Sequence, residues 1–208
     1  SRGLGDVYKR QVLPVRRRSM SSTDWLAAER ADLASRRILD RAEELFTARG
    51  VSSVTMRDVA QAVGCSRATL YRYFPGKTEL LAAYVDRAAG ELAEEIARGT
   101  RTVADPAERL VAAVRTALDG VRGNPALAAW FTPETAGPAT HLALVSPAIE
   151  SIATSFLGGV APASDETDRT ERARWLVRVI VSLLSDPAGS PDAAADLLPS
   201  LIHISEPP

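Results

Sequence analysis

The sequence predicts an all-α protein of two domains, and three observations support this. Apolar residues recur at helical spacing along most of the chain, as in residues 38–46. Helix-capping and helix-breaking residues separate these stripes, as Thr55 and Gly64 do. The 208 residues are enough for a small N-terminal domain and a larger helical domain sharing a continuous core. We place the N-terminal domain at residues 20–80 and the C-terminal domain at 81–199.

We interpret both ends of the chain as foreign to the protein. One short oligonucleotide, read on its two strands, encodes both GLGDVYKR (Gly3–Arg10) and SLIHISEP (Ser200–Pro207). Translated sequencing-adapter sequence has this property. We therefore interpret residues 1–11 and 200–208 as scars that do not belong to the natural protein. Residues 1–19 are then expected to be scar and disordered extension, with the natural start at Met20 and the natural C-terminus missing.

The first expected helix begins near Asp24 or Ser35 and ends at Arg49, where Gly50 supplies a stop. Its core-facing stripe consists of Ile38, Leu39, Ala42, Leu45 and Phe46. The role of this stripe is to hold the following elements at a fixed angle.

Residues 55–74 predict two short helices joined by a tight turn. Thr55 caps the first helix through its hydroxyl, and Asp58 completes a capping box three residues later. Gly64 ends this helix because glycine readily adopts the left-handed conformation that a sharp exit needs. This order of elements is the helix-turn-helix arrangement, whose second helix enters the major groove of DNA.

The second short helix, capped by Ser66, has an outer face of DNA-binding composition. Leu70 and Phe74 are spaced to point inward. The other side chains offer guanidinium, hydroxyl and phenol groups without a carboxylate: Arg67, Ala68, Thr69, Tyr71, Arg72 and Tyr73.

Local charge is more informative here than the net charge of −1. Between Arg49 and Lys77 the only acidic residue is Asp58. The cations of this region are Arg49, Arg57, Arg67, Arg72 and Lys77. Such a patch is expected of a small DNA-binding domain, although a solvated helical face is the alternative where no motif is present.

The single cysteine, Cys65, excludes an intrachain disulfide and a multi-cysteine zinc site. No apolar run is long enough to span a bilayer, and residues 12–20 are too short and arginine-rich for a signal peptide. We therefore expect a cytoplasmic protein with no membrane partner, metal or cofactor.

Three consecutive segments carry a family resemblance. ILDRAEELFTARG (Ile38–Gly50), TMRDVAQAVGCSRATLYRYF (Thr55–Phe74) and PGKTELL (Pro75–Leu81) closely resemble the DNA-binding region of the TetR (tetracycline-repressor-like) family of bacterial transcriptional regulators. The most specific part is TLYRYF followed by a lysine and an apolar helix. The resemblance implies a dimeric, ligand-responsive repressor that binds a palindromic operator in double-stranded DNA.

The resemblance also implies DNA contacts. The candidates are Thr55, Arg57, Ser66, Arg67, Ala68, Thr69, Tyr71, Arg72, Tyr73 and Lys77. Arg67, Ala68 and Thr69 are expected near base edges. Phosphate contacts are expected from Thr55, Tyr71, Tyr73 and Lys77. Arg57 suits either role. In this family the helix that Lys77 opens links the two domains, so its tilt sets the distance between the two reading helices of a dimer.

Further helices are expected at residues 105–123, 124–131, 149–157 and 165–185, with a last one from Asp192. Residues 123–164 carry only two charged side chains, Glu134 and Glu150, so this segment is expected to be largely buried, with room for a pocket. Candidate effector-site residues are Trp130, Phe131, His141 and Phe156. Plain core is the alternative for each of them. The scarcity of charge favours a mostly apolar effector.

The second half of the helix at 165–185 reads as apolar on nearly every side, which requires more cover than a small domain provides. A second subunit would supply that cover, and the candidate contacts are Trp175, Leu176, Val179, Ile180 and Leu183. The TetR family dimerises through its last two helices. We therefore expect the natural protein to be a homodimer, whereas dimerisation of this chain stays open because the suspected scar interrupts its last helix.

Two other functions remain as alternatives. The first is a helix-turn-helix regulator or interaction module without a small-molecule effector. The second is a helical enzyme. It has little support, because His141 is the only histidine outside the suspected scars and the uncharged segment lacks a carboxylate cluster.

Overall fold

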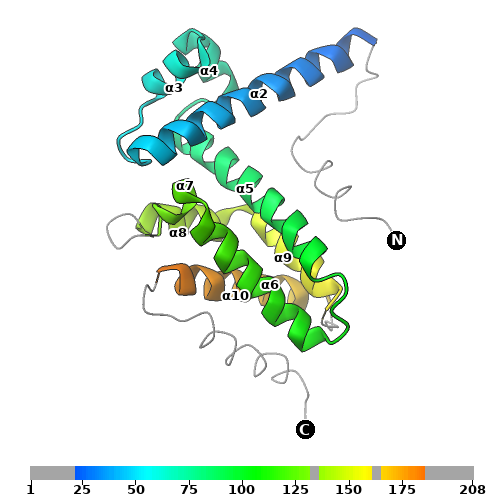
Figure 1. Cartoon of the computed structure of the whole chain (residues 1–208). Helices are drawn as coiled ribbons and strands as arrows, with labels where there is room; N and C mark the ends of the chain where they lie inside the picture. The colour runs from blue at the N-terminus through cyan, green and yellow to red at the C-terminus, as the bar shows by residue number, and fades with distance from the viewer. Residues whose placement is uncertain (1–21, 132–135, 161–164, 186–208) are drawn as a thin grey trace. The chain divides into compact units, whose positions relative to one another are not determined.

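A computed structural model describes residues 22–131, 136–160 and 165–185, and every regular element in these ranges is a helix, as predicted (Figure 1). In chain order the helices are α2 (Ser22–Arg49), α3 (Met56–Val63), α4 (Arg67–Tyr73), α5 (Lys77–Gly99), α6 (Pro106–Gly123), α7 (Pro125–Ala128), α8 (Ala136–Val145), α9 (Pro147–Gly158) and α10 (Glu166–Ser185). Both suspected scars and the expected last helix from Asp192 lie outside the described residues.

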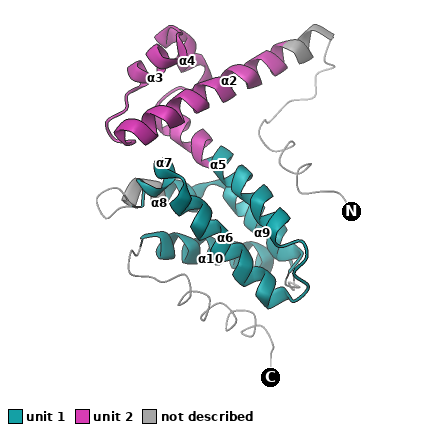
Figure 2. Cartoon of the chain, viewed as in Figure 1, with its two compact units in different colours: residues 1–8, 86–208 teal, residues 9–85 magenta. Residues whose placement is uncertain are grey.

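The chain divides into two compact units inside α5, between Val85 and Asp86 (Figure 2). The expected domain boundary at residue 80 falls earlier in the same helix. α5 therefore contributes its first turns to the N-terminal unit and the rest of its length to the C-terminal unit.

The N-terminal unit is a small helical domain in which α3 packs against both α2 and α4. Its buried side chains are Ile38, Leu39, Ala42, Phe46, Val54, Met56, Val59, Ala60, Leu70, Phe74, Leu80 and Tyr84. The predicted stripe of α2 thus forms the core, although Leu45 is only half-buried. Burying one of the larger apolar side chains of this core, such as Ile38 or Leu70, stabilises the fold by about 1.5–3 kcal/mol.

Tyr84 fixes the start of α5 to the N-terminal unit. It is fully buried, and its ring meets the ring of Phe46 edge-to-face with the centroids 5.6 Å apart. Its hydroxyl donates a hydrogen bond to Glu43 Oε1 at 3.2 Å. Tyr84 therefore combines apolar burial with a satisfied polar group.

The C-terminal unit is built around α10, which packs along α9 and also contacts α6 and α8. Its main buried cluster consists of Leu110, Val114, Leu118, Leu157, Val160, Ala173 and Leu176. A second cluster joins Ala143 of α8 to Val177 and Val181 of α10. Asp105 caps α6 by accepting a hydrogen bond from the Glu108 N–H at 2.8 Å.

The expectation that residues 123–164 are largely buried is wrong for α8. His141 is exposed, and the exposed fractions of Leu144 and Val145 are 39% and 54%. This helix packs on α10 through Ala143, and the three residues lie away from that contact. Few charges do not guarantee burial, because more than half of a typical protein surface is apolar.

The expectation that the second half of α10 is apolar on nearly every side is also wrong. One face is covered by its own unit and contains Ala173, Leu176, Val177 and Val181. The opposite face is exposed and contains Arg174, Trp175, Arg178 and Ser182. The arginines interrupt the apolar surface, so α10 needs less cover than its leucine and valine content indicates. None of the helices described has the length and apolar character needed to cross a membrane.

Candidate nucleic-acid interface

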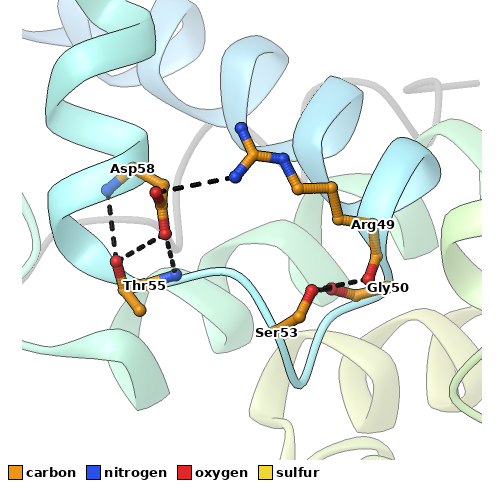
Figure 3. Close-up of polar contacts among 5 residues, drawn as sticks. All are labelled: Arg49, Gly50, Ser53, Thr55 and Asp58. Atoms are coloured by element: carbon orange, nitrogen blue, oxygen red, sulfur yellow. Dashed lines mark hydrogen bonds and ion pairs between the residues drawn. The ribbon is translucent and has the colours of Figure 1, made fainter.

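The N-terminus of α3 is closed by the predicted capping box (Figure 3). The Thr55 N–H donates a hydrogen bond to Asp58 Oδ2 at 2.9 Å, and the Asp58 N–H donates to Thr55 Oγ1 at 3.3 Å. The Thr55 hydroxyl also donates to Asp58 Oδ2. The sequence predicts that Thr55 binds a DNA phosphate. To do so, its hydroxyl would have to break its hydrogen bond to Asp58 and donate to the phosphate instead.

Arg49 links the end of α2 to this box, with Nη1 lying 3.6 Å from Asp58 Oδ1 (Figure 3). Hydrogen bonds from the Thr55 hydroxyl and N–H, with the charge of Arg49 as a smaller contribution, lower the pKa of Asp58. The carboxylate of Asp58, the only one between Arg49 and Lys77, is thus engaged at the surface by other groups of the protein. The exposed cations Arg57 and Arg72 leave the surface of this region positive.

The turn between α3 and α4 has the predicted geometry. Gly64 has φ of 77°, and its N–H donates to the Ala60 carbonyl at 3.1 Å. Ser66 then caps α4 by accepting a hydrogen bond from the Thr69 N–H at 3.0 Å. These local bonds end one helix and start the next within three residues, which fixes the direction of α4.

α4 presents a polar face to solvent and an apolar face to the core, as predicted. Leu70 is fully buried, and only 7% of Phe74 is exposed. Arg67, Ala68, Tyr71 and Arg72 are exposed, and Thr69 and Tyr73 are half-buried. α4 is therefore anchored from behind while its predicted DNA-contacting side chains face outward.

The two arginines of α4 lie against aromatic rings. The guanidinium carbon of Arg67 is 5.9 Å from the centroid of Tyr71, and that of Arg72 is 5.5 Å from the centroid of Tyr73. Contacts of this kind limit side-chain freedom while the charge stays accessible. They hold two cations on the exposed surface of the helix.

Lys77 connects the start of α5 to the loop before α3. Its Nζ donates a hydrogen bond to the Ser52 carbonyl at 3.2 Å, and partial burial lowers its pKa. An ammonium group has three N–H donors, and this bond uses one of them. Lys77 can therefore hold the loop and still donate to a phosphate.

The four candidate effector residues differ in burial and in the residues they pack against. Trp130 is buried with 4% of its surface exposed, whereas His141 is exposed. Phe131 packs against the Ala143 cluster. Phe156 packs against the main cluster, with the guanidinium carbon of Arg109 5.9 Å from its ring centroid.

A surface depression of about 320 Å³ lies along α6, and none of the four candidates lines it. Its lining residues are Ala107, Glu108, Val111, Ala112 and Arg115. All five of these described residues belong to α6.

The candidate dimer contacts on α10 differ in how far their own unit covers them. Leu176 has 7% exposure and belongs to the main cluster, against which Ile180 and Leu183 also pack. Val179 is half-buried, while 41% of Trp175 is exposed. Of the five, Trp175 is the side chain with most surface left for a partner.

Two of the polar contacts that sequence reasoning missed join different helices. The Arg49–Asp58 ion pair joins two residues whose individual roles were predicted, but their approach depends on how the chain folds between them. The Ser146 hydroxyl donates a hydrogen bond to Asp86 Oδ1 at 2.7 Å. Only the helix-start signal of Ser146 followed by Pro147 was visible in the sequence.

Together the anchored α4, the glycine turn and the cationic outer face define a helix-turn-helix DNA-binding protein. The family model of bacterial regulatory proteins, tetR family, matches residues 38–84. An HTH-type transcriptional regulator of Mycobacterium tuberculosis strain H37Rv is 48% identical over 168 residues, which cover 81% of this chain and 83% of that protein. The chain belongs to the TetR family and is a DNA-binding transcriptional regulator, not an enzyme.

Solved structures of the same family share the fold. The TetR family repressor AlkX from Dietzia sp. strain DQ12-45-1b aligns with a TM-score of 0.63 and 24% identity, covering 82% of this chain and 94% of AlkX. The repressor FadR of Thermus thermophilus, in complex with lauroyl-CoA, aligns with a TM-score of 0.57 and 23% identity, covering 82% and 92%. At these identities the likeness shows the fold alone.

Proposed function

We propose that this regulator is a repressor that binds a palindromic operator as a homodimer and leaves it when a small, mostly apolar effector binds. The observation that best supports the DNA-binding part is the exposed face of α4, where Arg67 and Arg72 are held against neighbouring rings. The homodimer, repressor and effector parts of the proposal are supported by membership of the TetR family.

In this proposal α4 lies in the major groove. Arg67, Ala68 and Thr69 are in the first turn of α4, the part of a recognition helix that meets base edges. Two such helices in a dimer reach successive major grooves about 34 Å apart. A palindromic site then follows from the two-fold symmetry of the protein.

Phosphates are contacted by the side chains that flank the first turn of α4. Tyr71, Tyr73 and Lys77 supply hydroxyl and ammonium donors, and Ser66 and Arg72 lie on the same helix or at its cap. Arg57, exposed on α3, contributes a further cation. Thr55 joins them only if its hydroxyl leaves Asp58.

The effector and dimer parts of the proposal concern the C-terminal unit. Trp130, Phe131 and Phe156 supply apolar surface in the C-terminal unit, and FadR, which has the same fold, binds lauroyl-CoA. Trp175 and Val179 provide apolar surface for a second copy. The exposed position of His141 makes it the least suitable of the effector candidates.

Selection of binding sites from a random duplex library tests the proposed function. We expect the enriched sequences to be palindromic, with the logarithm of the affinity falling linearly with the logarithm of salt concentration because phosphate contacts release counterions. Failure to enrich any sequence, together with no duplex binding in dilute salt, would contradict DNA binding by this chain.

One observation favours the alternative of a regulator without an effector, namely that the four candidate pocket residues lie in different surroundings. A thermal-shift screen of apolar small molecules distinguishes the two, with release from the selected duplex as the second readout. A compound that raises Tm and releases the DNA supports the effector. A saturating, diverse library that does neither favours the alternative.

A further inference from the structure

Ser146 is a buried polar residue whose hydroxyl makes two hydrogen bonds. Only 8% of it is exposed, and it caps α9 by accepting a hydrogen bond from the Ile149 N–H at 3.1 Å. Capping uses the hydroxyl oxygen as an acceptor. The hydroxyl proton is donated elsewhere, to Asp86 Oδ1 of α5 at 2.7 Å. Ser146 thus links the start of α9 to α5.

Asp86 lies on α5 at the point where this helix passes from the N-terminal unit to the C-terminal unit. Two residues earlier, Tyr84 is fully buried in the N-terminal unit, where it bonds Glu43 and packs on Phe46. Asp86 is the first residue that α5 contributes to the C-terminal unit. One continuous helix is therefore held at Tyr84 by the DNA-binding unit and at Asp86 by the other unit.

The charge of Asp86 and the burial of Ser146 both strengthen the hydrogen bond between them. A hydrogen bond to an ionised carboxylate is shorter and stronger than one between neutral groups. The carboxylate also lies at the N-terminus of α9, where the helix dipole favours negative charge. Because Ser146 is largely withdrawn from water, no solvent hydrogen bond easily replaces the one to Asp86.

We propose that Asp86 and Ser146 are positioning residues for DNA binding. Their hydrogen bond restricts the movement of α5 in the C-terminal unit, and the restriction is transmitted along α5 to the segment held by Tyr84. Loss of the bond then weakens operator binding although neither residue touches DNA. This inference rests on the proposed function, in which two copies of α4 must be held at the operator spacing.

A double-mutant cycle on the duplex selected by the wild-type protein tests this. Asp86→Ala and Ser146→Ala should each weaken binding by about 5- to 20-fold, in the usual range of coupling between sites. The double variant should bind about as weakly as the weaker single variant, because both changes remove the same bond. Ser146→Thr keeps the hydroxyl and should bind within about 3-fold of wild type, whereas Asp86→Asn keeps an acceptor without the charge and should lie between wild type and Asp86→Ala.

Asp105→Ala is the matched control for loss of a helix cap. Asp105 caps α6 in the same unit through the Glu108 N–H. Its loss should lower Tm measurably but by less than Ser146→Ala does, since Asp105 is exposed whereas Ser146 is buried and also bonds Asp86. Operator affinity should stay within about 2-fold of wild type. Equal loss of affinity in Asp105→Ala and Ser146→Ala would reduce Ser146 to a stabilising cap and overturn the proposal.

Two further outcomes would overturn it. One is a double variant whose loss of affinity equals the product of the single losses. The other is wild-type affinity in both single variants. If the wild-type protein selects no duplex, the proposed function fails, and hydrogen exchange of the α5 amides then tests the link itself. Asp86→Ala and Ser146→Ala should exchange faster there than Asp105→Ala, and equal rates would contradict the link.

Discussion

Among single residues, Lys77 has the most direct prediction. Because an ammonium binds phosphate without reading sequence, Lys77→Ala should weaken operator and random duplex by the same factor and reduce the salt slope by about 1. Fluorescence anisotropy across a salt series measures both. Arg101→Ala, which removes an exposed cation from the C-terminal unit, is the control and should change neither. Unequal factors for the two duplexes would mean that Lys77 contributes to sequence choice.

Asp58 gives a prediction about pH. Hydrogen bonds from Thr55 lower its pKa in the folded protein, so its contribution to stability is present above the ordinary carboxyl pKa of about 4 and is lost as pH falls through the lowered value. Asp58→Asn lacks this titration. Urea denaturation from pH 6 to pH 3 should show the wild-type advantage over Asp58→Asn shrinking toward acid. A constant difference across this range would refute the assignment.

The sequence predicted the residues of the capping box and the cap of α4 because both lie within three positions of their partners. It did not predict that Lys77 bonds the Ser52 carbonyl, because this contact depends on how α5 returns to the loop before α3. It also missed the Arg49–Asp58 pair for a similar reason. Local capping chemistry can be read from sequence, whereas contacts between elements require the fold.

At the scale of elements, the turn between α3 and α4 depends on Gly64. Its φ is 77°, and an added Cβ would meet no atom within 4 Å. The cost of Gly64→Ala therefore comes from the left-handed backbone alone and should be about 1–2 kcal/mol of unfolding free energy. Chemical denaturation measures it.

Gly99→Ala is the control for this prediction. Gly99 is the last residue of α5 and also has free space around its Cα, but its φ is not left-handed. Alanine there should be neutral or slightly stabilising, because it restricts the unfolded chain. Equal destabilisation by the two variants would show that backbone conformation is not the cause.

The helices of the N-terminal unit could be predicted more fully than those of the C-terminal unit. In α4 the spacing of Leu70 and Phe74 defines one buried face, and the structure confirms it. In α10 the many apolar residues predict a helix covered on nearly every side, but Arg174 and Arg178 lie on an exposed face. In α8 the lack of charge was read as burial, although Val145 is 54% exposed. Composition alone does not say which face meets a neighbour.

For the whole molecule, the exposed indole of Trp175 predicts a role in dimerisation. In the proposed homodimer, Trp175→Glu should shift sedimentation toward monomer, because it places a charge on surface proposed to meet a second copy. Leu33→Glu is the control, since Leu33 is 58% exposed on α2, and it should leave the dimer intact. An unchanged dimer in Trp175→Glu would place the interface elsewhere.

The family and the fold class followed from the sequence, because the motif of the N-terminal unit is specific and helical spacing is strong throughout. The effector site stays a prediction, because its candidates follow from composition alone, and Phe131 and Phe156 pack against separate clusters. Pocket formation depends on how several helices leave space between them. Single-residue patterns do not contain that information.

The central claim is that α4 reads DNA sequence, and Arg67 tests it most directly. The measurement is the affinity of wild-type and Arg67→Ala protein for the selected operator and for every single base-pair substitution of it. We predict that Arg67→Ala costs about 1–3 kcal/mol on the operator and loses its preference at one base pair in each half-site, with the other preferences intact. An unchanged preference at every base pair would contradict the account.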